Sequence, residues 1–444
     1  MFLISGTTLR RRLLEAVVVI LVGLFLRVPP SPAMVGDTGG AFGLDGSLRT
    51  IGALFRNYDF PAYFEDERAD EYFQSLFRLA AAGRPHDGLS YEVHLVQALT
   101  YFSGPRKTPG NGGITIAGGK TRYRAMDEAS EWWSGEHTRA LLWMDRCNVK
   151  VALAGMDITL GRQAVTFGKA HFWNPLDVYL PFDPNQFDRD YKAGVDALRV
   201  DIPLTSFSGI TMVGVLGREL DASGNYLEDN GTLDANWYGS SLLGRYFTNV
   251  AGWDLAFQAG KVYGGYQFGG GVVGEIEGVE LRGEAALFRA SESPPLPMPF
   301  AGDVFEDTLT VVFGLGRRFE NSLILEAEYL YNGGGESHAF NTAASRLAWG
   351  AVRHLGKHLA GILASYEFTR LLTGQFTSIY SLSDDSLELQ PTLTLSVSDN
   401  SELLAGLSLN FGRRPAWDPS GIGDIRSEFG SYPHSIFVEF KVYF

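Results

Sequence analysis

Charged and aromatic side chains are concentrated between residues 158 and 202, which read ITLGRQAVTFGKAHFWNPLDVYLPFDPNQFDRDYKAGVDALRVDI. Arginines stand near both ends of this stretch, and carboxylates and prolines fill its middle. Fixed guanidinium and carboxylate groups in a narrow passage select ions and charged solutes. The residues that could line such a constriction are Arg146, Lys150, Arg162, Trp173, Asp177, Asp183, Asp188, Asp190 and Arg199.

The same residues support a metal site or a catalytic site less well than a selective constriction. The carboxylates could hold calcium, but their spacing matches no standard calcium loop, so we predict neither a metal nor a cofactor. Most of the eight histidines fall in expected loops or turns, and no serine, histidine and acid form a nucleophilic constellation. We therefore predict no enzymatic activity. Cys147 is the single cysteine, which excludes a disulfide within the chain and a covalent c-type haem.

The elements that must position these residues are long alternating strands. Every second residue is apolar in LELQPTLTLSV, residues 387–397, and ELLAGLSLNFG, residues 402–412, repeats the pattern. A soluble β-sandwich also alternates, but its outer face is polar. Strands of about ten residues that recur along the whole chain are typical of a transmembrane barrel with lipid outside and water inside. The sequence therefore predicts an all-β fold, an antiparallel up-and-down transmembrane β-barrel.

The links between strands suggest how many strands the barrel has. The expected strands are 44–57, 72–82, 88–102, 138–151, 155–166, 194–203, 208–217, 237–248, 252–263, 265–275, 279–291, 306–319, 322–333, 344–355, 358–371, 386–398, 402–413 and 433–444. Links after even-numbered strands are short and most links after odd-numbered strands are long, as in barrels with short periplasmic turns and long extracellular loops. Eighteen strands are expected. Sixteen stays open, because such boundaries carry an error of about two to four residues.

The N-terminal residues indicate export. Three arginines, residues 10–12, precede an apolar run at 13–26, and small residues follow. This order is that of a secretory signal peptide, which we assign to residues 1–33. A membrane anchor is less favoured, because the apolar run is shorter than the roughly 18 residues that a spanning helix needs.

The C-terminal residues SIFVEFKVYF indicate how the barrel, residues 34–444, is closed and assembled. They alternate up to the last residue, and lipid cannot satisfy an open sheet edge, so this strand should seal the barrel. Phe440, Val442 and Phe444 resemble the signal that the barrel assembly machinery reads. We expect the outer membrane of a Gram-negative bacterium, with outer-membrane lipid and lipopolysaccharide as neighbours.

Residues 168–193 do not alternate like a wall strand. Their dense prolines and carboxylates favour a segment folded into the lumen as a constriction, although a loop packed on the rim stays open. Arg162 has the same parity as Ile158 and Leu160 and would point at lipid, at a cost of about 2–4 kcal/mol at mid-depth. We therefore expect a bulge near Gly161 that turns Arg162 inward.

Two motifs in this region resemble a known family. GRQAVTFG, residues 161–168, followed by GVDALRVD, residues 194–201, is similar to the core of alginate-export-like outer-membrane proteins, over residues 160–201. The resemblance implies an eighteen-stranded barrel, a pore, and lumen arginines at Arg162 and Arg199 that favour an anionic polymer. The proline-rich insert between the motifs departs from that family's pattern, so alginate itself is not inferred.

Composition and charge narrow the function. A formal net charge of −14 argues against nucleic acid, which needs basic patches. We expect an outer-membrane pore or exporter for a hydrophilic solute, either an anionic oligosaccharide or an organic acid. The alternatives are the barrel sheath of a porin–cytochrome electron conduit and, less favoured, an outer-membrane enzyme; a periplasmic partner stays open. Anion preference should depend more on Arg162 and Arg199 than on Arg282 and Arg318.

Overall fold

The structure is a computed structural model of the chain. It describes residues 35–36, 39–56, 69–103, 121–126, 129–184, 186, 189–221, 225, 227, 234–291, 293–298, 300–338, 340–417 and 423–444. The expected signal peptide, residues 1–33, lies outside the described residues.

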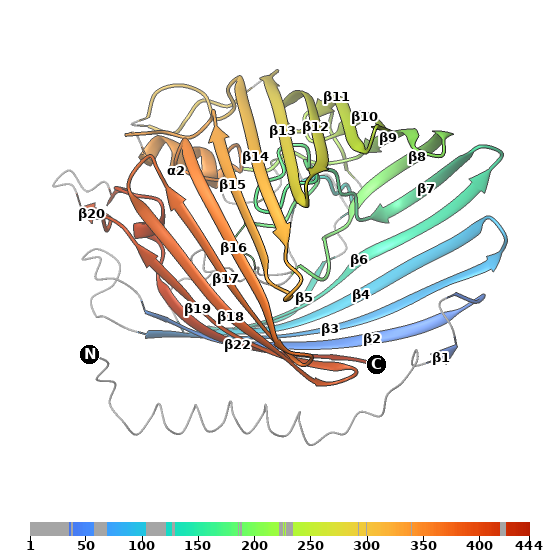
Figure 1. Cartoon of the computed structure of the whole chain (residues 1–444), viewed down its shortest axis with the longest axis horizontal. Helices are drawn as coiled ribbons and strands as arrows, with labels where there is room; N and C mark the ends of the chain where they lie inside the picture. Colours follow the sequence, from blue (N-terminus) through green and yellow to red (C-terminus); the bar gives the residue numbers. More distant parts are fainter. Residues whose placement is uncertain are drawn as a thin grey trace.

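Eighteen strands in the described part of the chain form the wall of one closed antiparallel barrel (Figure 1). They are β2 (Gly43–Arg56), β3 (Ala69–His86), β4 (Leu89–Phe102), β6 (Thr138–Leu153), β7 (Met156–Gln163), β8 (Val195–Thr205), β9 (Ser208–Val215), β10 (Ser241–Val250), β11 (Trp253–Val262), β12 (Gly265–Ile276), β13 (Val279–Ala290), β14 (Thr308–Arg318), β15 (Ile324–Asn332), β16 (His358–Thr369), β17 (Leu372–Ser381), β18 (Ser386–Ser398), β19 (Ser401–Phe411) and β22 (His434–Tyr443). The last strand, β22, pairs with both β19 and β2. The expected barrel class and its eighteen strands are confirmed.

The remaining elements lie beside this wall. β1 (Val35–Gly36) pairs with β2, and β5 (Ser130–Ser134) pairs with β6 beyond the point where β7 ends. β20 (Ala416–Trp417) and β21 (Gly423–Asp424) form a separate small pair. α2 (Phe340–Ala348) and the short 3₁₀ helix η1 (Phe429–Ser431) lie in links. Within the described residues, no helix is both long and apolar enough to cross a membrane.

The two ends of the barrel differ. At one, which we call the turn end, strands are joined by tight turns such as Ala251–Gly252 and Glu277–Gly278, where both central residues have positive φ. This is the geometry of type I′ hairpin turns, which glycine favours. At the other, the loop end, long links such as 164–194 and 333–357 join the strands. The first wall strand, β2, begins at the turn end, and the last wall strand, β22, finishes at the same end.

Two expected segments differ from the structure. The strand predicted at 344–355 is wrong: helix α2 and an irregular link occupy these residues. Alanine and leucine favour a helix there, and buried Phe340, Ala343 and Arg346 recur at a helical spacing. The loop predicted at 372–385 is also wrong, because β17 fills most of it; its glycine, serine and threonine content hid the alternation. The two errors cancel in the strand count.

The outer face of the wall is apolar. Leu160, Phe257, Phe313 and Ile362 are each more than half exposed, with Leu160 at 64%. Buried residues with the opposite parity include polar side chains such as Gln258. An apolar outside and a polar inside suit a barrel surrounded by lipid.

Candidate functional site

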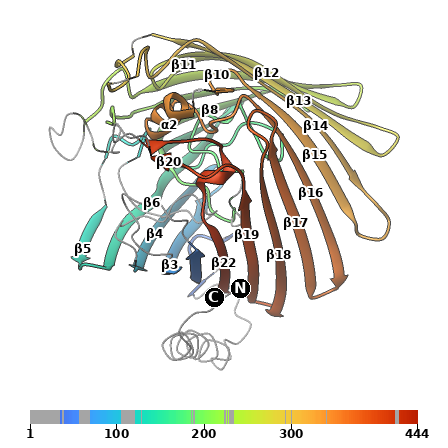
Figure 2. The same ribbon diagram turned by 90° about the vertical axis from the view of Figure 1, so that its left-hand side faces the viewer.

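The link between β7 and β8, residues 164–194, enters the barrel interior. We call it the inward segment (Figures 1 and 2). Its residues contact strands far around the wall: Gln258 Nε2 on β11 donates to the carbonyl of Leu176 at 2.8 Å, and Gln267 Nε2 on β12 donates to the carbonyl of Pro175 at 3.0 Å. A segment packed only on the rim would not reach these strands.

Two buried wall carboxylates accept hydrogen bonds from the main chain of the inward segment. Glu328 on β15 accepts from the backbone N–H groups of His171, Phe172 (2.8 Å) and Trp173 (3.4 Å). Glu284 on β13 accepts from the N–H of Lys169. Hydrogen bonds to an ionised acceptor are roughly twice as strong as neutral ones. The two carboxylates therefore fasten the middle of the segment to one side of the wall.

Wall glycines make room for the same stretch. A Cβ added to Gly361 on β16 would lie 2.9 Å from the ring of Phe172. One added to Gly269 on β12 would lie 2.5 Å from a methyl of Leu176. Both distances are shorter than side-chain contacts allow, so these positions need glycine for the segment to pack. Part of the glycine run in β12 thus has a packing reason.

Arg162 lies just before the inward segment and does not line a passage. Its Nε donates to Asp196 Oδ1 at 2.6 Å, and its amino groups donate to the carbonyls of Met144 and Met126. The expected bulge near Gly161 is wrong, because β7 keeps its register with both neighbouring strands. Arg162 shares the outward parity of exposed Leu160, but residues 121–126 cover it, and its side chain is 2% exposed.

The other wall candidates are also paired. Arg199 donates two hydrogen bonds to Asp201, at 2.7 and 2.9 Å. Arg146 donates to Glu92 at 2.8 Å and to the carbonyl of Lys192 at 3.3 Å, so it contacts the inward segment. Lys150 lies 2.6 Å from Asp157. The carboxylate partners offset the positive charge of these side chains, so each cation contributes less to ion selectivity.

Within the inward segment, the aromatic and acidic candidates have separate environments. Trp173 is buried against Phe172 and apolar residues of β14 to β17. Asp177 is buried and accepts from Lys192 Nζ at 2.6 Å. Burial raises the pKa of the Asp177 carboxyl and the nearby ammonium opposes that shift. Asp183 is exposed, whereas Asp188 lies outside the described residues.

The far end of the inward segment reaches the last strand. Asp190 accepts from Lys441 Nζ at 2.7 Å and from the Tyr443 hydroxyl at 2.8 Å, both on β22. The Arg78 guanidinium on β3 lies 4.1 Å from the ring centre of Tyr191. The segment is thus held on both sides of the barrel.

The C-terminal residues singled out as an assembly signal take part in closure. Phe440 lies opposite Thr50 on β2, and Val442 lies opposite Leu48. The Phe444 N–H donates to the carbonyl of Gly46 at 2.9 Å. These contacts describe the closed wall, and recognition by an assembly machine stays a prediction.

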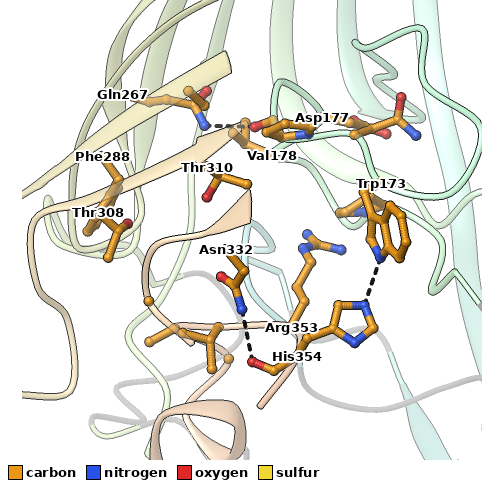
Figure 3. Close-up of a pocket in the computed structure, with 18 of the residues that line it drawn as sticks. Trp173, Asp177, Val178, Gln267, Phe288, Thr308, Thr310, Asn332, Arg353 and His354 are labelled. Carbon is orange, nitrogen blue, oxygen red and sulfur yellow. Dashed lines mark hydrogen bonds between the residues drawn. The ribbon is translucent and has the colours of Figure 1, made fainter. Parts of the chain in front are cut away.

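The inward segment lines several cavities, and two of them reach the wall strands of β10 to β15. The upper pocket, about 210 Å³, lies between Phe172–Val178, the loop-end halves of β11 to β15 and the link 333–357 (Figure 3). The lower pocket, about 630 Å³, lies between Thr166–Lys169 and the turn-end parts of β10 and β11, with Arg199 and Arg245 in its lining. The segment separates the two.

The upper pocket contains two arginines that have no hydrogen-bonded or ion-paired carboxylate among the described residues. Arg353 points into it (Figure 3), and its acidic neighbours Asp177 and Asp183 interact with it electrostatically without a hydrogen bond or ion pair. Asp177 is already paired with Lys192. Arg122 donates to the carbonyls of Gly350 and Trp349 and stacks on Tyr263, with no carboxylate partner in the described part of the chain. These groups leave the pocket with positive charge available to an anion.

Sequence reasoning missed the residues that hold and line this region from other links. Arg353 and His354 fell in a predicted strand, and the loop residue Glu428 carried no motif. Glu284 and Glu328 were recognisable as inward-facing by strand parity alone, but their partners were not. Besides the prolines and carboxylates of the segment itself, lumen-facing glycines such as Gly361 were a further local signal that a segment packs inside.

Comparisons with known proteins support the fold. No family model matches the chain, and no curated protein matches it. The solved structure of OccK8 (OprE) from Pseudomonas aeruginosa is similar, with a TM-score of 0.53 and 10% identity, covering 91% of this chain and 99% of that one. OccAB2 from Acinetobacter baumannii has a TM-score of 0.55 and 10% identity, covering 92% and 99%. The expected alginate-export-like membership finds no support here, whereas the coarser description holds: the chain has the fold of a porin-like β-barrel.

Proposed function

We propose that this protein is a solute-selective pore of the Gram-negative outer membrane and that the inward segment forms its constriction. The observation that carries the proposal is the path of residues 164–194, which cross the interior between two cavities and are fastened to β13 and β15 on one side and to β22 on the other. A solute moving between the barrel ends has to pass this segment.

The solute that we propose is a small organic acid. The upper pocket of about 210 Å³ equals roughly seven water volumes at about 30 Å³ each, which suits a small molecule better than an extended polymer. Arg353 and Arg122 supply positive charge, while Phe172, Trp173 and Tyr263 supply apolar surface. An anionic oligosaccharide would need a longer row of such sites.

The alternative of a sheath around a multihaem carrier is less supported. Such a sheath would need a wide lumen lined by small residues, and the inward segment crosses this lumen. We also propose no enzymatic role. Outer-membrane lipid and lipopolysaccharide, the barrel assembly machinery and a periplasmic partner remain expectations from the sequence.

Conductance of the refolded protein in planar bilayers tests the proposal. The wild-type barrel should conduct in discrete steps, and removal of Asp177–Asp190 should raise the step size about twofold or more, because the constriction sets the narrowest resistance. Heat-modifiable gel mobility controls for folding. A folded deletion variant with unchanged conductance would place the segment outside the conducting path, and a folded wild type without conductance would argue against a pore.

A further inference from the structure

His354 joins three separate links at the wall of the upper pocket (Figure 3). The Trp173 indole N–H of the inward segment donates to His354 Nε2 at 2.9 Å. His354 Nδ1 lies 2.7 Å from Glu428 Oε1 in the link 412–433. Asn332 Nδ2 donates to the His354 carbonyl at 3.1 Å. His354, Trp173 and Glu428 are all buried, so water does not readily replace these contacts.

The partners determine which form of the imidazole this geometry accepts. An indole nitrogen can only donate, so His354 Nε2 must accept, and the ring hydrogen must sit on Nδ1, from which it donates to Glu428. A proton added at Nε2 would oppose the indole N–H with a second donor. The Trp173 contact therefore exists only with neutral His354.

The charged groups around His354 come from four elements. Glu428 faces it directly and accepts the Nδ1 hydrogen. Arg353 is its neighbour in the chain. Asp384, in the link 382–385, accepts from the Glu428 N–H at 2.8 Å, and Asp177 of the inward segment lines the same pocket. The ring thus lies between a carboxylate that accepts its Nδ1 hydrogen and an indole that donates to its Nε2.

Release of Trp173 would affect the constriction. Its backbone N–H lies 3.4 Å from Glu328, which is a weak contact, while the indole bond to His354 is the shorter of the two at 2.9 Å. Losing the indole bond leaves only apolar packing to place the ring at the pocket wall. We propose that His354 is the positioning residue for Trp173: neutral His354 clamps the indole against the upper pocket, and protonated His354 releases it, so the constriction responds to acid. The effect on transport rests on the proposed pore function.

We call the Trp173–His354 hydrogen bond the clasp. A pH series on the refolded protein tests it with two readouts. Protonation of His354 removes the acceptor of the indole, so we expect wild-type mean conductance to change roughly twofold between neutral and acidic pH. His354→Gln keeps an acceptor for the indole but cannot be protonated, and it should abolish the response. Trp173→Phe should resemble acidified wild type at every pH. His358→Gln, a histidine bonded to Tyr329 instead, should keep the wild-type profile.

Tryptophan fluorescence in detergent gives the second readout, which needs no pore. The wild-type minus Trp173→Phe difference should change between neutral and acidic pH, and the difference should be flat on the His354→Gln background. If fluorescence titrates in a folded barrel that does not conduct, the clasp stands and the pore proposal fails. If the barrel conducts but both readouts stay flat with pH, or if His354→Gln keeps the response, the clasp is overturned.

Discussion

Two ion pairs hold the inward segment, and they differ in burial more than in length. Arg162–Asp196 joins the residues of β7 and β8 that flank the segment, and it spans 2.6 Å with side chains 2% and 8% exposed. Lys441–Asp190 joins the segment to β22 and spans 2.7 Å, with the Lys441 side chain 9% and the Asp190 side chain 38% exposed. The two ion pairs thus have similar distances but differ in how far water reaches them.

The difference shows which contacts can move. Asp196 also accepts from the N–H groups of Ala125 and Met126 at 2.8 and 3.0 Å, so the buried pair holds a second link against the wall. Removing one partner of a buried pair leaves an uncompensated charge and costs about 3–5 kcal/mol. An exposed pair contributes roughly 0–1 kcal/mol. We infer that the base of the segment, where β7 and β8 flank it, is fixed and that its contact with β22 through Asp190 is the part that can shift.

The largest effect should follow Arg162→Gln. Asp196 would lose its bidentate partner in a dry site, so we expect the free energy of unfolding to fall by about 3–5 kcal/mol, measured from the urea midpoint of the heat-modifiable gel shift. Arg199→Gln is the matched control, because its pair with Asp201 is about 30% exposed, and it should change the midpoint little. Equal midpoints for the two variants would contradict the assigned role of burial. The sequence-based expectation that Arg162 sets anion preference is replaced by this structural role.

An intermediate effect should follow Glu328→Gln. The amide would present its own N–H₂ to the backbone N–H groups of the segment. A buried backbone N–H that loses its acceptor costs about 1–3 kcal/mol. Hydrogen exchange of the peptide covering Lys169–Leu176 should become faster by roughly tenfold or more, while exchange in β4 stays slow. Asp201→Asn is the control, because it removes a wall carboxylate that contacts Arg199 and Thr211 instead of the Lys169–Leu176 main chain. If that variant accelerates the same peptide equally, Glu328 is not a specific anchor.

The smallest effect should follow Asp190→Asn. Lys441 would keep Glu439 at 3.9 Å as a second acidic neighbour, and the site is partly in water, so stability should change by at most about 1 kcal/mol. Mobility of the far end should rise nevertheless, visible as broader electron-spin resonance lines from a label at Asp183. A stability loss as large as that of Arg162→Gln would mean that the contact with β22 is as fixed as the base.

The wall was largely predictable from the sequence, because a wall strand carries its own signal. Each strand alternates between lipid and lumen at a spacing of two residues, so β18 and β19 were located from their own letters. The helix at 340–348 and the strand β17 show the limit: where alanine runs or glycine and serine weaken the alternation, local pattern no longer separates strand from link.

The sequence by itself determined a closed alternating barrel and located an unusual acidic and proline-rich stretch between β7 and β8. Only the tertiary structure decided where that stretch lands. Trp173 and His354 are 181 positions apart, and His171 and Glu328 are 157 apart. No local periodicity encodes such pairs, because they form only when barrel closure brings distant strands and links around one interior.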